Sequence, residues 1–595
     1  MQAVACSGAL AQNVSVVVLA WRLTSTIACI RADVMDALLD AALKASPLFR
    51  LAADIIAKER VRIVSLASGD PLFAEGDPGQ CAYLILDGVV GLYRRDPALQ
   101  VSWLFRRAVL GDLIGELAVF SDEARSGSAI CLTDAVVAEI DQELLQHCIS
   151  QSPAFCLALI KSTATAASVG RQAIESELPQ IILVQLECGQ DSAPSTHYLL
   201  ELIGDATSSR VVDKRGAEWP RQEQLAEFSA AIQAKRQSIY LVDHCSCIDQ
   251  TASKLVDRYV LVTDQSTISE PQTLASLDVV RLWPAGQVRP VAPANPESLR
   301  TVRQVYNVRK GNDRDARRAV RNILGIGNAL VLGGGGAKGF AHVGVLKAFS
   351  ERGFDDIDIV YGVSIGSFVG GLLAIEETWQ DIYAAMVSIF AEGSPYSLSL
   401  PVHSVFSYGK DLLRIRDLFG DLDITNTWIP FVPGSVDITN SVMRFWRSGP
   451  LFDCVLASMS IPGLAPPVRM ADGSYNVDGC VLNNLPVAQA RKSNRGRLVA
   501  VSLEKGFGPP APLSSTSNKV FKFLASTNFA NDNLPLVSDV ITHSLLCTTR
   551  IRFKEEARYS DVFIAPDTSR YGILDWKAHR EIMDEGYAQG MSAEL

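Results

Sequence analysis

The sequence of 595 residues contains no long hydrophobic run, although 48% of its residues are hydrophobic. A helix that crosses a bilayer needs about 20 consecutive apolar residues, and the best candidate, residues 14–21, is much shorter. Arg22 is the first basic residue, so this run also lacks the positive start of a secretory signal. Because Met35 opens a clearer helical pattern, we expect the first 34 residues to be a mis-called start or a disordered lead. The N-terminal segment 1–48 is left unassigned.

Paired cysteines and excess positive charge are also lacking. The 12 cysteines are irregularly spaced, which favours reduced side chains in the cytoplasm over a disulfide framework. The cluster His244-Cys245-Ser246-Cys247 lacks a second pair at metal-site spacing, so we predict a strand end there and no metal. With 55 Lys and Arg against 65 Asp and Glu, the net charge of −10 argues against nucleic acid as a partner.

The length predicts several domains, because a single hydrophobic core stops growing at about 250–300 residues. We expect a multidomain α/β protein with an N-terminal β-barrel, a central α/β spacer and a C-terminal α/β hydrolase domain with a mainly parallel sheet. The expected segments are residues 1–48, 49–165, 166–325 and 326–595.

Short β-rich runs separated by turn residues fill residues 61–140, which predicts a small β-barrel or sandwich. Within it, Gly115-Glu116-Leu117-Ala118 is followed by Arg125. These residues resemble the phosphate cassette of the cyclic-nucleotide-binding domain family. The resemblance implies that backbone N–H groups and Arg125 receive a phosphate, while Glu116 receives a ribose hydroxyl. The expected nucleotide-binding residues are Gly115, Glu116, Leu117, Ala118, Arg125 and Ser126.

A cyclic nucleotide is therefore an expected effector, and a barrel that binds no nucleotide and acts as a docking surface is the alternative. The alternative arises because Ala124, Ser126 and Gly127 depart from the family's pattern, which has Pro before the arginine and Ala with Ala or Thr after it. The fold prediction is the same in both cases.

Residues 179–284 alternate apolar runs with longer mixed stretches, which is typical of an α/β layer. No glycine-rich phosphate loop occurs there, so we interpret this segment as a structural spacer. Residues 303–321 then form a basic stretch that predicts a solvated helix leading into the next domain, with contact to anionic lipid as the alternative. Its basic residues include Arg309, Lys310, Arg314, Arg317 and Arg318.

An apolar run at 329–332 leads into a glycine loop, residues 333–339, and then into helical periodicity. Spacing within the loop matches a dinucleotide-binding pattern, although that pattern alone is weak. The acidic residues near the spacing of its ribose ligand are Asp355, Asp356 and Asp358. The other phosphate-loop form, which needs Gly before the lysine and Ser or Thr directly after it, fails because Ala337 precedes Lys338 and Gly339 follows it.

The next apolar run, 357–361, enters Gly362-Val363-Ser364-Ile365-Gly366 and then a helix of small residues. This order is typical of a nucleophile elbow, in which the serine occupies a sharp turn and Gly362 and Gly366 avoid Cβ clashes. Both loops are then expected at the same end of a parallel sheet. N–H groups near Gly335 and Gly336 would face the oxygen that becomes anionic when Ser364 attacks a carbonyl.

A third block comprises residues 457–462 and 476–484 and contains Asp478-Gly479. The three blocks together resemble the patatin-like phospholipase family, over about residues 328–488. The resemblance implies a dyad of Ser364 and Asp478 in a patatin-like α/β hydrolase domain. The oxyanion loop that it implies comprises Gly334, Gly335, Gly336, Lys338 and Gly339.

Two residues depart from that family's pattern. Lys338 replaces the more usual arginine of the glycine loop, and a bidentate guanidinium contact would be lost. Cys480 replaces a usual Gly or Ala and places a thiol beside Asp478, with no role assigned to it.

An exposed aspartate with a pKa of about 3.9 is a poor base near neutral pH, so we expect Asp478 to be partly buried.

The order of a nucleotide-binding-like domain, a spacer and this block resembles the neuropathy target esterase branch of the family. The resemblance implies hydrolysis of phospholipid or lysophospholipid at a membrane surface by a cytoplasmic, peripheral protein that requires no cofactor. Head group, acyl chain and oligomeric state are not indicated. His342 is expected to be a helix residue near the site and not a base. Three alternatives stay open: a Ser-His-Asp triad with His543 or His579, a cyclic-nucleotide-responsive regulator whose hydrolase activity is secondary, and a dinucleotide enzyme.

Overall fold

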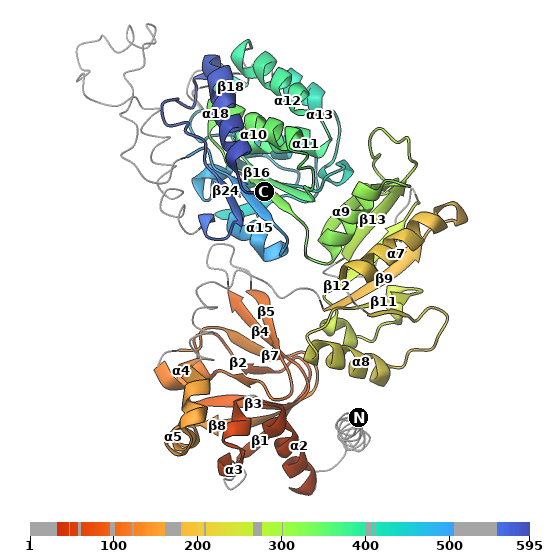
Figure 1. The fold of residues 1–595 in the computed structure, drawn as a ribbon, viewed down its shortest axis with the longest axis vertical. Coiled ribbons are helices and arrows are strands. Elements are labelled where there is room, and N and C mark those ends of the chain that lie inside the picture. Colours follow the sequence, from red (N-terminus) through yellow and green to blue (C-terminus); the bar gives the residue numbers. More distant parts are fainter. Residues whose placement is uncertain are drawn as a thin grey trace, which may run out of the picture. The chain divides into compact units, whose positions relative to one another are not determined.

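A computed structural model describes most of the chain (Figure 1). The described residues are 32–46, 48–56, 61–95, 102–121, 124–160, 180–207, 210–265, 277–299, 302–393, 396–398, 406–408, 412–504 and 556–595. They divide into two compact units, Met1–Ile181 with Gly216–Ser238 and Ser246–Asp257, and Ile182–Arg215 with Ile239–Cys245 and Arg258–Leu595. No helix within these described ranges is long and apolar enough to cross a membrane.

The first unit contains two four-stranded antiparallel sheets, as the sequence predicted for a β-barrel. One sheet runs β1 (Arg62–Leu66), β8 (Ala135–Asp141), β3 (Cys81–Asp87) and β6 (Leu113–Ile114), and the other β2 (Pro71–Phe73), β7 (Ser128–Cys131), β4 (Val90–Arg95) and β5 (Ser102–Ala108). Their inward side chains, such as Val90 and Val137, form a shared core. The α-helices of this unit include α2 (Ala32–Ala45), α3 (Ala53–Ile56), α4 (Glu116–Ser121), α5 (Gln142–Gln151) and α8 (Arg221–Gln233), and residues 153–160 are helical as well.

The second unit begins with the predicted α/β layer. Its six-stranded sheet has the order β10 (Arg210–Asp213), β11 (Ser238–Val242), β9 (Ile181–Glu187), β12 (Arg258–Thr263), β13 (Leu277–Trp283) and β14 (Gln304–Arg309). Parallel pairing joins β9 to β12, β12 to β13 and β13 to β14. Helices α7 (Ala193–Thr207) and α9 (Asp313–Ile323) accompany this sheet. Strand β11 ends just before His244, and no group of three or more potential metal ligands occurs among the described residues.

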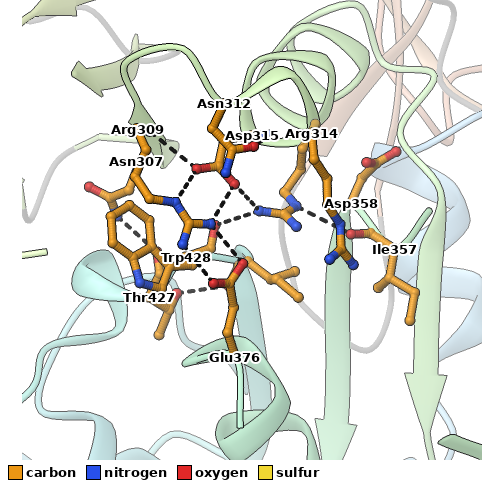
Figure 2. Close-up of polar contacts among 12 residues, drawn as sticks. Asn307, Arg309, Asn312, Arg314, Asp315, Ile357, Asp358, Glu376, Thr427 and Trp428 are labelled. Carbon is orange, nitrogen blue, oxygen red and sulfur yellow. Dashed lines mark hydrogen bonds and ion pairs between the residues drawn. The ribbon is translucent and has the colours of Figure 1, made fainter. Parts of the chain in front are cut away.

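The prediction of a solvated basic helix at 303–321 is wrong. Residues 304–309 form the buried strand β14, and only the following α9 is helical. Arg318 is 2% exposed, and Arg309 forms ion pairs with Asp315 and Glu376 (Figure 2). Asp315 from the same stretch and the distant Glu376 therefore compensate these charges inside the protein, where the sequence pattern suggested water.

The C-terminal sheet has the order β21-β22-β19-β16-β15-β23-β24, with β20 paired to β19. Its strands are β15 (Ala329–Leu332), β16 (Ile359–Val363), β19 (Phe431–Asp437), β20 (Val442–Phe445), β21 (Val468–Arg469), β22 (Tyr475–Asp478), β23 (Leu498–Val501) and β24 (Val562–Ile564). Strands β19, β16, β15, β23 and β24 are neighbours in this order and are parallel to one another. Strands β20 and β22 are antiparallel to β19. Strands β15, β16 and β23 are buried along their whole length, as expected for a sheet covered on both faces.

Helices surround this sheet, and Figure 1 shows α10 and α11 beside β16. The described α-helices are α10 (Phe340–Glu351), α11 (Ile365–Ala374), α12 (Trp379–Met386), α13 (Leu412–Phe419), α14 (Leu451–Met459), α15 (Val487–Ser493) and α18 (His579–Ser592). A short hairpin, β17 (Tyr396–Leu398) and β18 (Phe406–Tyr408), lies apart from the main sheet. The parallel order brings the ends of β15 and β16 to one edge, where ligand sites of such sheets form.

Candidate active site

Ser364 lies in the tight turn between β16 and α11, with a φ of 56°. This backbone conformation costs a non-glycine residue roughly 1–3 kcal/mol and marks many functional sites. A Cβ atom on Gly366 would lie 2.3 Å from Leu332 O, and one on Gly362 would lie 2.6 Å from Gly366 O. The turn therefore excludes side chains at both positions, which is the steric reason for the glycines on either side of Ser364.

Ser458 holds the backbone of this turn. Its Oγ accepts a hydrogen bond from Ser364 N at 2.9 Å and donates one to Gly434 O at 2.6 Å. Ser367 Oγ lies 2.7 Å from the same oxygen, and Ser458 is completely buried. Sequence reasoning placed Ser458 in the third block but did not find this role, because the contact joins residues 94 positions apart.

Asp478 ends β22, which pairs antiparallel with β19 so that Asp478 is opposite Ser435. Strand β19 also pairs with β16, and there Gly434 is opposite Val363, the residue before Ser364. This arrangement brings Asp478 beside the elbow. Ser364, Asp478 and the glycine loop line one small cavity, whose lining residues are Gly334, Gly335, Gly336, Ser364, Ile461, Asp478, Cys480, Asn484, Glu504 and Ile573.

The carboxylate of Asp478 is completely buried, and burial raises its pKa from 3.8 to about 6. The Ser364 hydroxyl and the Cys480 backbone and thiol oppose this rise. Asp478 Oδ1 accepts the Cys480 N–H at 2.8 Å, whereas Oδ2 has no hydrogen-bond partner of normal geometry among the described residues. Oδ2 is therefore a buried acceptor beside the hydroxyl of the candidate nucleophile, Ser364.

Asn484 braces the glycine loop. Gly334 N donates to Asn484 Oδ1 at 3.1 Å, and Asn484 Nδ2 donates to Gly334 O at 3.0 Å. A Cβ atom on Gly334 would lie 2.4 Å from Asn484 Oδ1 and 2.7 Å from Ser364 Cβ, so only glycine allows this approach. The third sequence block contains both Asn484 and Asp478, but no role was predicted for Asn484. Its closeness to Asp478 in the chain was the one signal that could have indicated this role.

The other loop contacts show which N–H groups face the cavity. Ala337 N donates to Ile573 O at 2.8 Å, and Lys338 N donates to Gly335 O at 3.3 Å. No acceptor for the N–H groups of Gly335 and Gly336 occurs among the residues that the structure describes. Because the Gly334 N–H is already bonded to Asn484, Gly335 and Gly336 are the candidate donors to an oxyanion.

Comparisons with known proteins match two families to this chain. Residues 330–491 match the patatin-like phospholipase family, and residues 63–152 match the cyclic nucleotide-binding domain family. The chain carries a patatin-like phospholipase domain and a cyclic nucleotide-binding domain. The first match contains the elbow, Asp478 and the glycine loop, and the second contains both four-stranded sheets except for their outermost residues.

Curated relatives match most of this chain at low identity. Patatin-like phospholipase domain-containing protein 7 of Rattus norvegicus is 23% identical over 617 residues, covering 89% of this chain and 45% of the relative. Patatin-like phospholipase domain-containing protein 6 of Homo sapiens is 23% identical over 612 residues, covering 88% of this chain and 44% of the relative. An uncharacterized NTE family protein of Mycobacterium bovis is 26% identical over 533 residues, covering 87% of this chain and 89% of the relative. The chain thus spans about half the length of the mammalian relatives that it matches.

Two solved structures illustrate the matches to part of the chain. The N-terminal domain of a transcriptional regulator from Streptomyces coelicolor is 29% identical, with a TM-score of 0.19, over 22% of this chain and 94% of that domain. Thermus thermophilus Catabolite Activator Protein is 20% identical, with a TM-score of 0.18, over 30% of this chain and 64% of that protein.

Lys338 of the patatin-like domain forms an ion pair with Glu504, with 3.0 Å between Nζ and Oε1. Both side chains are nearly buried, at 10% and 13% exposure. The ammonium group is thus bonded at the rim of the cavity and does not replace the N–H donors of the loop. Gly339 packs on the first turn of α11, since a Cβ there would lie 2.4 Å from Ile365 Cγ1.

Neither histidine that the structure describes near the patatin-like site lines the cavity. His342 Nε2 is 2.7 Å from Gly333 O, and burial lowers its pKa to about 4, so it supports the glycine loop as a neutral ring. His579 Nδ1 is 2.7 Å from Tyr383 OH, and its ring packs against Phe340. His579 is thus partly buried and is bonded away from the cavity. His543 lies outside the described residues.

The acidic residues at ribose spacing all pair with arginines of α9, Asp358 in the interior and Asp355 and Asp356 at the surface. Asp358 accepts two hydrogen bonds from Arg321 and one from Asn328 N, and Asp356 pairs with Arg321. Asp355 Oδ2 lies 3.8 Å from Arg314 Nε. A dinucleotide ribose would have to displace these contacts, which disfavours that alternative.

In the cyclic nucleotide-binding domain, Arg125 is buried beneath its cassette. Its Nη1 donates to Gly115 O and its Nη2 to Cys81 O, both at 2.5 Å, and the guanidinium lies 4.4 Å from the centre of the Phe73 ring. Arg125 Nε is buried with no partner among the described residues. Glu116 opens α4, and burial raises the pKa of its carboxyl. The cassette continues with the partly buried Leu117 and the buried Ala118, whereas Ser126 is exposed.

Replacing Asn484 with alanine is expected to lower kcat on esters by about 10²-fold with little change in KM, because an unbraced loop no longer aims its N–H groups. Steady-state kinetics and the affinity for a trifluoromethyl ketone, which forms an oxyanion on Ser364, measure the effect. Asn483→Ala is the matched control, since the Asn483 amide donates to Glu556 and not to the loop. Equal losses in both variants would contradict the bracing role.

Proposed function

We propose that this protein is a lipid ester hydrolase that cleaves carboxyl esters of phospholipids or lysophospholipids through a dyad of Ser364 and Asp478. The observation that carries the proposal is the convergence of three parts in one cavity: a serine in a strained elbow, a buried carboxylate and a braced glycine loop. The matches to the patatin-like phospholipase family and to its mammalian members support the lipid ester class.

In the first half of the reaction, Asp478 Oδ2 takes the hydroxyl proton as Ser364 Oγ attacks the ester carbonyl. The carbonyl oxygen becomes anionic and is held by the N–H groups of Gly335 and Gly336. Collapse of this intermediate expels the alcohol, which takes the proton from Asp478. The products of this half are an acyl-enzyme on Ser364 and a lysophospholipid or glycerophospho alcohol.

In the second half, a water molecule gives a proton to Asp478 and attacks the acyl-enzyme carbonyl. The same N–H groups hold the second oxyanion, and its collapse returns the proton to Ser364 and releases a fatty acid. The chain itself supplies the nucleophile, the base and the oxyanion donors of this mechanism. Because phospholipid substrates reside in bilayers, we propose that the protein works at a membrane surface.

A lipid panel tests this function. Purified protein is incubated with phospholipids, lysophospholipids, triacylglycerol and a short-chain ester, and released fatty acid is measured. Release from the phospholipid classes above that from triacylglycerol is the expected result. Protein inactivated beforehand with a fluorophosphonate provides the blank. Hydrolysis of the short-chain ester alone would place the activity outside the phospholipid class.

We also propose that a cyclic nucleotide is an effector, with Arg125 as its phosphate ligand. The buried Nε of Arg125, which has no partner among the described residues, supports this role. A phosphate would replace at least one carbonyl now bonded to the terminal nitrogens of Arg125. Phosphate binding and internal support of the domain therefore compete for the same guanidinium group.

Arg125→Ala is expected to remove the heat of binding of cyclic AMP or cyclic GMP and to destabilise the domain. Two partly buried carbonyls, Gly115 O and Cys81 O, lose their donor, and an unpaired buried group costs about 1–3 kcal/mol. Calorimetry and thermal unfolding measure the two effects, and Arg62→Ala is the control, because Arg62 is exposed and pairs only with Glu139 at the surface. If Arg125→Ala is destabilised but the intact protein gives no heat of binding with either nucleotide, the domain is a docking surface and not a nucleotide site.

A further inference from the structure

A cluster of arginines and carboxylates joins the central α/β layer to the patatin-like domain (Figure 2). We call it the arginine cluster, and it consists of Arg309, Arg318, Arg321, Asp315, Asp358 and Glu376. The arginines and Asp315 come from β14 and α9 of the central layer, whereas Asp358 and Glu376 belong to the patatin-like domain. Asp315 and Asp358 have side chains that are 0% and 1% exposed.

Arg309 is the centre of this cluster. Its Nε and Nη2 donate to both oxygens of Asp315, at 2.6 and 2.9 Å, and its Nη1 and Nη2 donate to both oxygens of Glu376, each at 2.9 Å. The guanidinium also lies 4.2 Å from the centre of the Trp428 ring. Only the planar fork of arginine can satisfy two carboxylates in this way, and lysine cannot replace it.

Glu376 follows helix α11, the helix that begins directly after Ser364. Its φ of 65° and the hydrogen bond from Glu376 N to Leu373 O end that helix in a tight cap. Trp428 N and Ile429 N both donate to Ala374 O, the last residue of α11. Arg309 therefore fixes the far end of the nucleophile helix through Glu376 and through Trp428.

The other side of the elbow is held in the same way. Arg321 donates to both oxygens of Asp358 at 2.7 Å, and Asn322 Nδ2 donates to Asp358 O at 2.9 Å. Asp358 directly precedes β16, the strand that ends at the residue before Ser364. Arg318 adds a hydrogen bond to Ile357 O. The strand entering the elbow is thus anchored at its start by α9.

We propose that the central α/β layer is a positioning module for the nucleophile, with Arg309 and Arg321 as positioning residues. This inference rests on the proposed hydrolase function. The strained φ of Ser364 persists only where the surrounding structure holds it. The arginine cluster supplies that support from outside the patatin-like domain, at the outer ends of both elements that meet at Ser364. The segment interpreted from the sequence as a spacer thereby acquires a role in catalysis.

Arg309→Met tests the proposal, because methionine keeps most of the side-chain stem over Trp428 and removes the charge. Glu376→Gln is a milder second variant, since Glu376 is 27% exposed and glutamine keeps its size. We expect Arg309→Met to lower kcat per active site by about ten-fold or more, with KM nearly unchanged, because small displacements of a nucleophile are costly. The rate of fluorophosphonate labelling of Ser364 should fall in parallel, and Glu376→Gln should change both in the same direction.

Arg303→Met is the matched control. Arg303 forms a buried ion pair with Asp278 and donates to Tyr306 OH within the same sheet, without contact to the elbow elements. We expect it to lower the Tm while kcat per titrated site and the labelling rate stay at the wild-type values. A merely structural role of Arg309 would give this same pattern in Arg309→Met.

Hydrogen exchange makes the result independent of lipid activity. Amides of residues 359–374 should exchange faster in Arg309→Met and Glu376→Gln than in Arg303→Met. Unchanged exchange there, together with an unchanged labelling rate, would overturn the positioning role. A wild-type protein that neither labels nor hydrolyses lipid would instead overturn the proposed function, and the exchange result would still decide the role of the arginine cluster.

Discussion

Ser364→Ala is expected to abolish release of fatty acid from every lipid and to abolish covalent labelling by a fluorophosphonate. The variant lacks the oxygen that forms the acyl-enzyme, so the loss in kcat should be on the order of 10⁵-fold. The fold should not change, because the hydrogen bond from residue 364 to Ser458 uses the backbone N–H. Mass spectrometry of the labelled protein and the lipid panel measure the two effects, and unfolding curves verify the fold.

Ser350→Ala provides the matched control for this experiment. Ser350 is an exposed serine near the end of α10 in the same domain, and its loss should leave activity and labelling unchanged. Labelling that persists in Ser364→Ala would move the nucleophile to another residue. In that case the elbow would be a structural turn only.

Asp478→Asn should lower kcat by about 10³–10⁴-fold, because the amide cannot accept the Ser364 proton. Oδ1 of asparagine can still accept the Cys480 N–H, so the geometry of the site should persist. Wild-type activity should be full above pH 6 and fall as the pH drops through about 6, since protonated Asp478 is not a base. The pH profile of kcat/KM and single-turnover acylation of a chromogenic ester measure this prediction.

Asp478→Asn should also make the protein more stable at neutral pH. The folded-state pKa of Asp478 lies above its unfolded value, so the folded protein binds more protons between pH 4 and 6 and wild-type stability falls as the pH rises through this range. Above pH 6 the buried charge costs up to about 3 kcal/mol, because each pKa unit is worth about 1.4 kcal/mol. Denaturant unfolding at pH 4 and pH 8 should show the gain at pH 8 only.

Histidine variants separate this dyad from a triad. His579→Ala should retain kcat because His579 is bonded to Tyr383 away from the cavity. We expect His543→Ala to retain it as well. A loss in either variant as large as that in Asp478→Asn would restore the Ser-His-Asp alternative.

Local features of the site were predictable from the sequence. Glycines at 362 and 366 are required by contacts within a few residues of the turn and with the adjacent strand, so the elbow pattern contains its own steric reason. The alternation of apolar runs likewise predicted the barrel sheets and the α/β layer, because burial of a strand depends mainly on its own side chains. Gly335 and Gly336 are the candidate oxyanion donors both from the sequence pattern and from the hydrogen bonds of the structure.

Charged residues were the least predictable, because their surroundings depend on distant partners. Arg318 has the local sequence of a solvated helix, yet its contacts with Asp315, Ile357 and Trp428 bury it. Arg125 has the spacing of a phosphate ligand, but its terminal nitrogens bond to backbone carbonyls. A charge pattern in one segment contains no information about the segment that will pack against it.

The sequence by itself determined the elbow around Ser364 and the glycine loop, because both depend on short-range steric rules. It also indicated the order of the domains, because each domain has its own motif. Only the tertiary structure decided that Asp478 lies in the same cavity as Ser364 and has a pKa of about 6. It also decided that Asn484 braces the loop and that the arginine cluster anchors both sides of the elbow. These properties arise from burial and from pairing between segments that are far apart in the chain, which only the packed fold brings together.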